Sequence, residues 1–187
     1  LQPGISWSPD SKQIVIAAKA GATDALYLID IKSGNQEKIK FELDGVFTAS
    51  WSPNGNKLAF VGNEGGASDI YIYDLESKET TNITNDIYSD TEPSWSPDGD
   101  LIVFISDRGN NDNSENTTAI DMLGHNYNQR NVYTIDLLSK KINQVTDSDY
   151  NENYPIFANT KNTIFYTADY QGTWNLFRHD LNTGKST

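Results

Sequence analysis

Two histidines are the side chains of this 187-residue chain best suited to acid–base or metal chemistry. His125 lies in a polar stretch and is expected to face solvent, whereas His179 stands in an alternating segment where a packed or rim position is expected. Two imidazoles without any cysteine are too few for a typical zinc or manganese site. A Gly-x-Ser-x-Gly nucleophile motif and a glycine-rich phosphate loop are also absent from the sequence. We therefore predict a non-catalytic chain, or a non-catalytic domain of an enzyme.

One acidic segment carries oxygen-bearing side chains at alternate positions, as the first half of a calcium-binding loop does. The candidate ligands are Asp147, Asp149 and Asn151. A calcium loop needs glycine at its sixth position and glutamate at its twelfth, where this segment has Glu152 and Ala158. We therefore favour a hydrophilic loop and no cofactor, with Ca²⁺ binding by these three residues as the alternative.

Four further aspartates each end a short aromatic or apolar segment and precede turn residues. Asp and Ser side chains at such places accept or donate hydrogen bonds to the backbone of the turn. A structural role is therefore expected for Asp30, Asp74, Asp136 and Asp180.

A second motif, Ser-Trp-Ser-Pro-(Asp/Asn), recurs with the same period as these aspartates. Its tryptophans, Trp7, Trp51 and Trp95, stand 44 residues apart, and Phe157 takes the corresponding place in a fourth, degenerate copy. The third unit is longer by an insertion of 18 residues. Self-similarity at about 40–45 residues indicates a β-propeller with one four-stranded antiparallel blade per repeat. The four aromatics are expected in the first strand of each blade, buried between neighbouring blades.

The sequence therefore predicts an all-β propeller segment with four repeats. The blades are expected over about residues 5–48, 49–92, 93–154 and 155–187, with the insertion at 108–130. The last blade is expected to lack its outer strand. Because an open arc would leave apolar blade faces in water, the four repeats are expected to be part of a larger propeller.

These repeats resemble the TolB-like or PD40 family of WD40-like propeller repeats, whose core sequence is WSPDG. The resemblance covers the whole chain with three good copies and one weak copy. It implies a protein-binding scaffold in the periplasm, outside the cell or in the cell envelope. It leaves the function open, because similar repeats occur in Tol-Pal components, peptidase propellers and polysaccharide lyases.

Composition limits the partners that the chain can bind. The formal net charge is −12, with 14 basic and 26 acidic residues, and a basic run is absent, which disfavours nucleic acid. Apolar stretches of about 18 residues are also absent, so membrane insertion is not expected. A protein or peptide partner is expected, and open blade edges would allow self-association.

Chain parity predicts which face of the propeller binds partners. In a four-stranded antiparallel blade, the connections between blades and the loops between strands two and three lie on one face. That face should carry the 108–130 insertion and two connections rich in tyrosine and carboxylate, and long loops with aromatic side chains mark binding faces. Glu92 and Tyr154 should stand near the mouth of the central channel. The candidate partner-binding residues are Tyr88, Asp90, Glu92, Tyr150, Glu152 and Tyr154.

Three functions are compatible with these features. The favoured one is a non-catalytic protein-binding or scaffolding propeller that uses this loop-rich face. One alternative is an accessory or gating domain of a larger peptidase or hydrolase. The other is a propeller that binds a carbohydrate or another small ligand.

Overall fold

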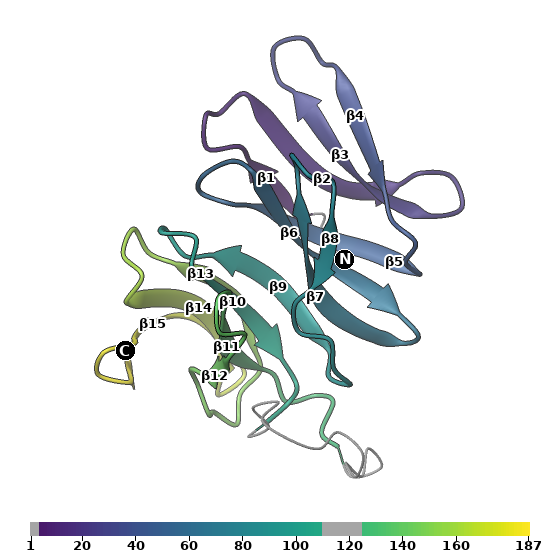
Figure 1. Cartoon of the computed structure of the whole chain (residues 1–187). Helices are drawn as coiled ribbons and strands as arrows, with labels where there is room; N and C mark the ends of the chain where they lie inside the picture. Colours follow the sequence, from purple (N-terminus) through teal and green to yellow (C-terminus); the bar gives the residue numbers. More distant parts are fainter. Residues whose placement is uncertain (1–3, 110–124) are drawn as a thin grey trace.

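The computed structural model describes residues 4–109 and 125–187, and it contains four separate four-stranded antiparallel sheets (Figure 1). In each sheet the strands follow one another in sequence order. Sheet 1 consists of β1 (Ile5–Trp7), β2 (Gln13–Lys19), β3 (Asp24–Asp30) and β4 (Gln36–Lys40). Sheet 2 consists of β5 (Gly45–Trp51), β6 (Lys57–Glu64), β7 (Ala67–Asp74) and β8 (Thr80–Asn82). Sheet 3 consists of β9 (Asp90–Trp95), β10 (Leu101–Ser106), β11 (Asn131–Asp136) and β12 (Ile142–Gln144). Sheet 4 consists of β13 (Glu152–Phe157), β14 (Thr163–Tyr170), β15 (Thr173–Asp180) and β16 (Lys185–Ser186).

The sheets stack in sequence order around a common centre, which confirms the predicted propeller architecture. The first strands β1, β5, β9 and β13 are innermost, and neighbouring members of this set contact one another. Within the described residues, sheets 1 and 4 do not touch, so the four sheets form an open arc. The part of the chain that the structure describes has no helix long and apolar enough to cross a membrane.

The repeated tryptophan holds each sheet to the one before it. Trp51 of sheet 2 is buried in a cluster with Val15 and Leu26 of sheet 1, and Trp95 of sheet 3 is buried against Ile70 of sheet 2. Phe157 packs in the same way against sheet 3. The predicted burial of these aromatics is therefore confirmed for both tryptophans and is partial for Phe157.

Trp7 departs from this prediction, since its side chain is 55% exposed. The face of sheet 1 that carries it has no neighbouring sheet within the described residues, whereas Trp51 and Trp95 each have one. Burial of the motif tryptophan thus depends on the adjacent blade and not on the motif itself.

The four repeated aspartates have the predicted structural role. Each carboxylate accepts backbone N–H groups of the turn that follows the third strand, as when Asp74 Oδ1 accepts from Glu76 and Ser77 at 3.0 Å. The same arrangement recurs at Asp30, Asp136 and Asp180.

The outer strand of sheet 4 corrects the prediction that the last blade lacks one. After Asp180 the chain reverses through Gly184, whose φ of +65° suits a residue without Cβ. The Gly184 N–H donates to the Asp180 carbonyl at 2.8 Å, and the two-residue strand β16 then pairs with His179 and Asp180. The repeated turn thus returns the chain alongside β15, as in the other sheets.

Candidate functional site

The innermost strands of sheets 2, 3 and 4 share an irregularity at the same position. The pairing with the second strand shifts register there, and the bulged residues are Thr48, Glu92 and Tyr154, with φ values of +35°, +58° and +55°. Each stands three residues before the motif aromatic of its strand. Positive φ is unfavourable for residues with a Cβ, and bulges re-aim side chains at functional sites. A threefold recurrence therefore marks these positions as candidates for function.

Sheet 1 has glycine at the corresponding place. A Cβ on Gly4 would lie 3.0 Å from Cγ2 of Thr48 and 3.2 Å from its Cα. The inner strands of sheets 1 and 2 therefore approach so closely here that a larger residue would require Thr48 to shift. From sheet 1 to sheet 4, this position is occupied by Gly4, Thr48, Glu92 and Tyr154. It therefore provides no side chain, a hydroxyl, a carboxylate and a phenol, respectively.

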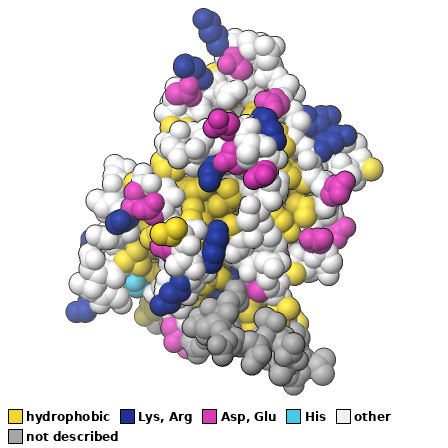
Figure 2. Space-filling model, viewed as in Figure 1, with side chains coloured by type: hydrophobic (Ala, Val, Ile, Leu, Met, Phe, Trp, Pro, Cys, Tyr) yellow, Lys and Arg dark blue, Asp and Glu magenta, His cyan; other side chains and the backbone are white. Residues whose placement is uncertain are grey.

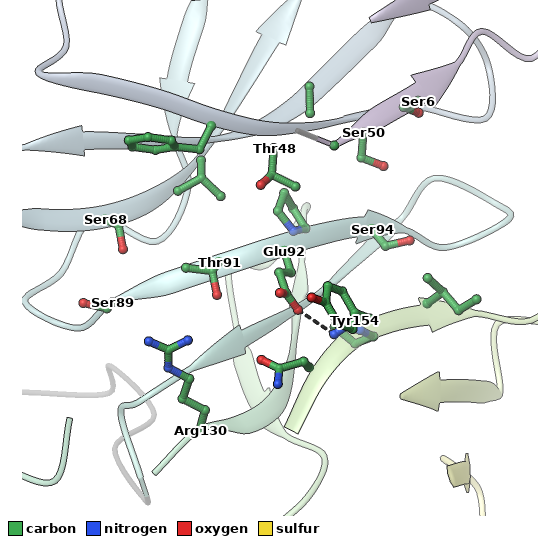
Figure 3. A pocket seen from close by; sticks show the side chains of 18 of the residues that line it. Ser6, Thr48, Ser50, Ser68, Ser89, Thr91, Glu92, Ser94, Arg130 and Tyr154 are labelled. Atoms are coloured by element: carbon green, nitrogen blue, oxygen red, sulfur yellow. Dashed lines mark hydrogen bonds between the residues drawn. The ribbon is translucent and has the colours of Figure 1, made fainter. Parts of the chain in front are cut away.

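All four of these residues line one cavity of about 930 Å³ at the centre of the arc. Serine hydroxyls recur along its wall at 44-residue intervals, at Ser6, Ser50 and Ser94. Figure 3 shows the side chains of Glu92 and Tyr154 next to each other in this space, with Arg130 nearby. In the view of Figure 2, hydrophobic side chains gather in the middle of the molecule, where the sheets converge, and most charged side chains surround them.

Glu92 and Arg130 are the charged residues among the described residues that line the cavity. The Glu92 carboxylate accepts a hydrogen bond from the backbone N–H of Tyr154. Burial raises the pKa of Glu92, and the Tyr154 N–H and the charge of Arg130 oppose that rise. The Tyr154 side chain is 52% exposed. The cavity thus offers an acceptor, a cation and an accessible aromatic ring within a mainly uncharged wall.

The structure separates the six predicted partner-binding residues. Glu92 and Tyr154 lie in the central cavity, as chain parity suggested, and Tyr150 is half-buried. Tyr88, Asp90 and Glu152 are at most 1% exposed, which corrects the expectation of one accessible surface formed by all six. The bulges explain the difference: alternation alone would place residues 90 and 92 on one face, but the register shift at Glu92 turns them apart.

Asp90 faces Arg108, a buried residue that the sequence did not single out. One guanidinium nitrogen of Arg108 lies 2.7 Å from both carboxylate oxygens of Asp90, and another lies 3.0 Å from Asp86. Three aromatic rings surround the guanidinium carbon at 5.4–5.6 Å, and they belong to Tyr88, Phe104 and Tyr133. Burial raises the pKa of Asp90, and the Arg108 charge opposes the rise. Charged partners and rings together stabilise a guanidinium that is 0% exposed.

This ion pair fixes the start of the predicted 108–130 insertion to the connection between sheets 2 and 3. Residues 110–124 of the insertion lie outside the described residues. At its end, His125 Nε2 lies 3.3 Å from Asp107, and its side chain is 10% exposed. The expectation that His125 faces solvent is therefore wrong, because its ring packs against those of Tyr88 and Tyr127. The regular spacing of the tryptophans could not predict these contacts of Arg108 and His125.

The predicted packing of His179 is confirmed, since it is 4% exposed and its Nδ1 lies 2.9 Å from Ser186 Oγ. Burial lowers its pKa. The alternative Ca²⁺ ligands Asp147, Asp149 and Asn151 are all exposed, and their binding of Ca²⁺ stays a prediction. Among the described residues, carboxylates of Asp69, Asp86 and Asp90 do converge within 4.8 Å, but Arg108 already supplies positive charge to two of them.

Comparison with known proteins agrees with the architecture. The family model PD40, the TolB beta propeller domain, matches residues 2–115. A search of curated proteins gives no match. TolB from Acinetobacter baumannii has a similar structure, with 24% identity and a TM-score of 0.78, and the match covers 98% of this chain and 42% of that one.

Two further solved structures share the fold. A protein from Agrobacterium tumefaciens assigned as TolB has 17% identity and a TM-score of 0.77, with 98% of this chain and 60% of that one covered. The tricorn protease has 16% identity and a TM-score of 0.71, with 98% of this chain and 22% of that one covered. The chain therefore spans less than two thirds of each of these proteins, and these identities show a shared fold.

Proposed function

Since this chain belongs to the TolB beta propeller domain family, we propose that it is a non-catalytic scaffold that binds an extended protein segment in its central cavity. Domains with this fold occur in proteins of several functions, so the fold alone does not identify the ligand. Family membership supports a location in the cell envelope. It also supports a protein partner over a small molecule.

The repeated inner-strand bulge is the observation that carries this proposal. Three residues with positive φ, in three sheets, direct their side chains to one cavity of about 930 Å³. Positive φ at a non-glycine residue costs about 1 kcal/mol or more, and such strain clusters at binding sites. In sheet 1, whose inner strand pairs without a register shift, the equivalent residue is glycine.

The lining favours a polypeptide segment with a basic or amide donor. Tyr154 offers contact area at little entropic cost, and the hydroxyls of Ser50 and Ser94 can pair with a peptide backbone. Glu92 attracts a cationic group, and the net charge of −12 raises the local concentration of basic partners. Binding should therefore weaken as salt rises, because exposed charges are screened within about 8–10 Å.

Peptides selected from a displayed random library for binding to the wild-type chain would test this proposal. Tyr154→Gly and Glu92→Gly each remove a cavity side chain and relax a positive φ, so folding should be kept. We expect the selected peptides to bind either variant at least about tenfold more weakly, equivalent to about 1.4 kcal/mol.

Lys140→Gly is the matched control, because Lys140 also has a positive φ, of +61°, but lies in an exposed turn at Asp136–Lys140. It should leave the affinity unchanged. Selected peptides that tolerate both cavity variants and lose affinity on alteration of the Asp98–Gly99 turn would place binding on the opposite face and contradict the proposal.

A further inference from the structure

The surroundings of Arg108 recur between sheets 3 and 4. The guanidinium of Arg108 lies among the rings of Tyr88, Phe104 and Tyr133 and contacts the buried carboxylate of Asp90. We call this group the Arg108 site. It is built from the connection into sheet 3, from the first three strands of that sheet and from the loop that follows the second strand.

One repeat later, the same positions hold the same kinds of side chain. The equivalents are Tyr150, Glu152, Tyr166 and Phe177, at intervals of 62 residues across the insertion and 44 after it. Phe104 and Tyr133 have ring centroids 6.0 Å apart at 33°, and Tyr166 and Phe177 have theirs 5.6 Å apart at 17°. Glu152 is 1% exposed, as deeply buried as Asp90. The rings and the carboxylate are thus conserved between the two repeats of this chain.

The cation is the member of the group that differs. Tyr170 stands at the position equivalent to Arg108, and its ring lies against Tyr150 with the centroids 5.0 Å apart. The Glu152 carboxylate accepts hydrogen bonds from Val132 N–H and from the hydroxyls of Thr146 and Ser148. Within the described part of the chain, no lysine or arginine forms an ion pair with Glu152.

A cavity of about 270 Å³ lies here, and its lining includes Tyr150, Glu152, Tyr166, Phe177 and His179. We propose that it is a binding site for the guanidinium group of an arginine side chain from a partner protein. The chain's own Arg108 shows that this set of rings and carboxylate holds a guanidinium in the neighbouring repeat. We call the new group the Glu152 site.

The energetics favour a delocalised cation in this site. A guanidinium over aromatic faces gains cation–π energy, and a carboxylate partner offsets the cost of removing the charge from water. Burial lowers the pKa of His179, so its ring is neutral at neutral pH and does not repel the ligand. Asp147, exposed at the cavity wall, adds a second negative charge. This site is distinct from the central cavity, and the inference does not rest on the proposed function.

Titration with the blocked tripeptide acetyl-Gly-Arg-Gly-amide, followed by backbone amide NMR shifts, tests the proposal. The matched ligand contains citrulline, which has the shape of arginine and no charge. We expect saturable shifts at Tyr150, Phe177 and His179 with the arginine peptide, and at least tenfold weaker binding of the citrulline peptide.

Two variants separate binding from folding. Glu152→Gln removes the charge and keeps an acceptor for Val132 N–H, so arginine affinity should fall at least tenfold. Tyr170→Arg places an internal guanidinium where Arg108 lies in the previous repeat, so it should abolish binding while the melting temperature is kept or raised. Lys140→Gly, in the exposed turn at Asp136–Lys140, should leave binding unchanged. Equal binding of both peptides, or undiminished arginine binding by the folded Tyr170→Arg variant, would overturn the proposal.

Discussion

A serine hydroxyl donates to the side chain two residues later in the turn after each motif tryptophan. The acceptor is a carboxylate at Asp10 and Asp98 and an uncharged amide at Asn54. The Ser8 hydroxyl, with the backbone N–H of Lys12, lowers the pKa of Asp10 to about 2. The side chain of Lys161, with the Ser96 hydroxyl, lowers the pKa of Asp98 to about 2. The same turn is therefore sensitive to acid in sheets 1 and 3 and insensitive in sheet 2.

Asp10→Asn should consequently reduce the acid sensitivity of folding. The folded-state pKa of about 2 lies below the ordinary value of 3.8, so the stabilisation by Asp10 is present above pH 3.8 and is lost as pH falls through about 2. Urea unfolding between pH 2 and 5 should show a shallower loss of stability for Asp10→Asn than for the wild type. The reciprocal change Asn54→Asp should steepen it, and parallel curves for all three proteins would contradict this account.

At the scale of the element, the stability that the first strand of a sheet contributes depends on whether a neighbouring sheet packs against it. Trp51 is 7% exposed and packs against sheet 1, whereas Trp7, in the same motif, is 55% exposed. Trp51→Ala should lower the free energy of unfolding by about 3–5 kcal/mol, because it leaves a cavity between sheets. Trp7→Ala, the internal control, should cost about 1 kcal/mol or less. Chemical denaturation would measure both, and equal losses would argue against packing between sheets as the source.

The same strands show how far the sequence predicts the structure. Residue spacing predicted the four sheets, the aspartate turns, and the places of Glu92 and Tyr154 near the channel, because repeats impose local geometry wherever they recur. It did not predict that Asp90 is buried, because a bulge alters alternation without leaving a composition signal. The Arg108 ion pairs were also missed, since they join the loop after β10 to Asp86 and to the start of β9, a contact that depends on tertiary docking.

The molecule as a whole exposes an apolar face at sheet 4. Ile156, Trp174 and Leu176 are 53%, 54% and 70% exposed, while Val132, the equivalent of Leu176 in sheet 3, is 0% exposed beneath sheet 4. Apolar patches of this kind mark contact surfaces. The side chains that cover such a face in sheet 3 belong to the following sheet.

A polypeptide of these 187 residues should therefore self-associate through this face. Sedimentation velocity over a range of concentrations should show oligomers, and Leu176→Glu should shift the distribution toward monomer. Leu138→Glu is the matched control, because Leu138 is 95% exposed in a turn and should have no effect. A monomer at every concentration for the unmodified chain would contradict this prediction.

The direction in which the tryptophans pack has a consequence for synthesis on the ribosome. Trp51 and Trp95 each dock onto the sheet that precedes them in the chain, so the receiving surface is translated before the side chain that fills it. A repeat of 44 residues emerges in roughly 2 to 9 s, which is ample time for a sheet to form. Each new sheet can then fold onto a finished template, and assembly advances from the first repeat toward the last without waiting for the remainder of the chain.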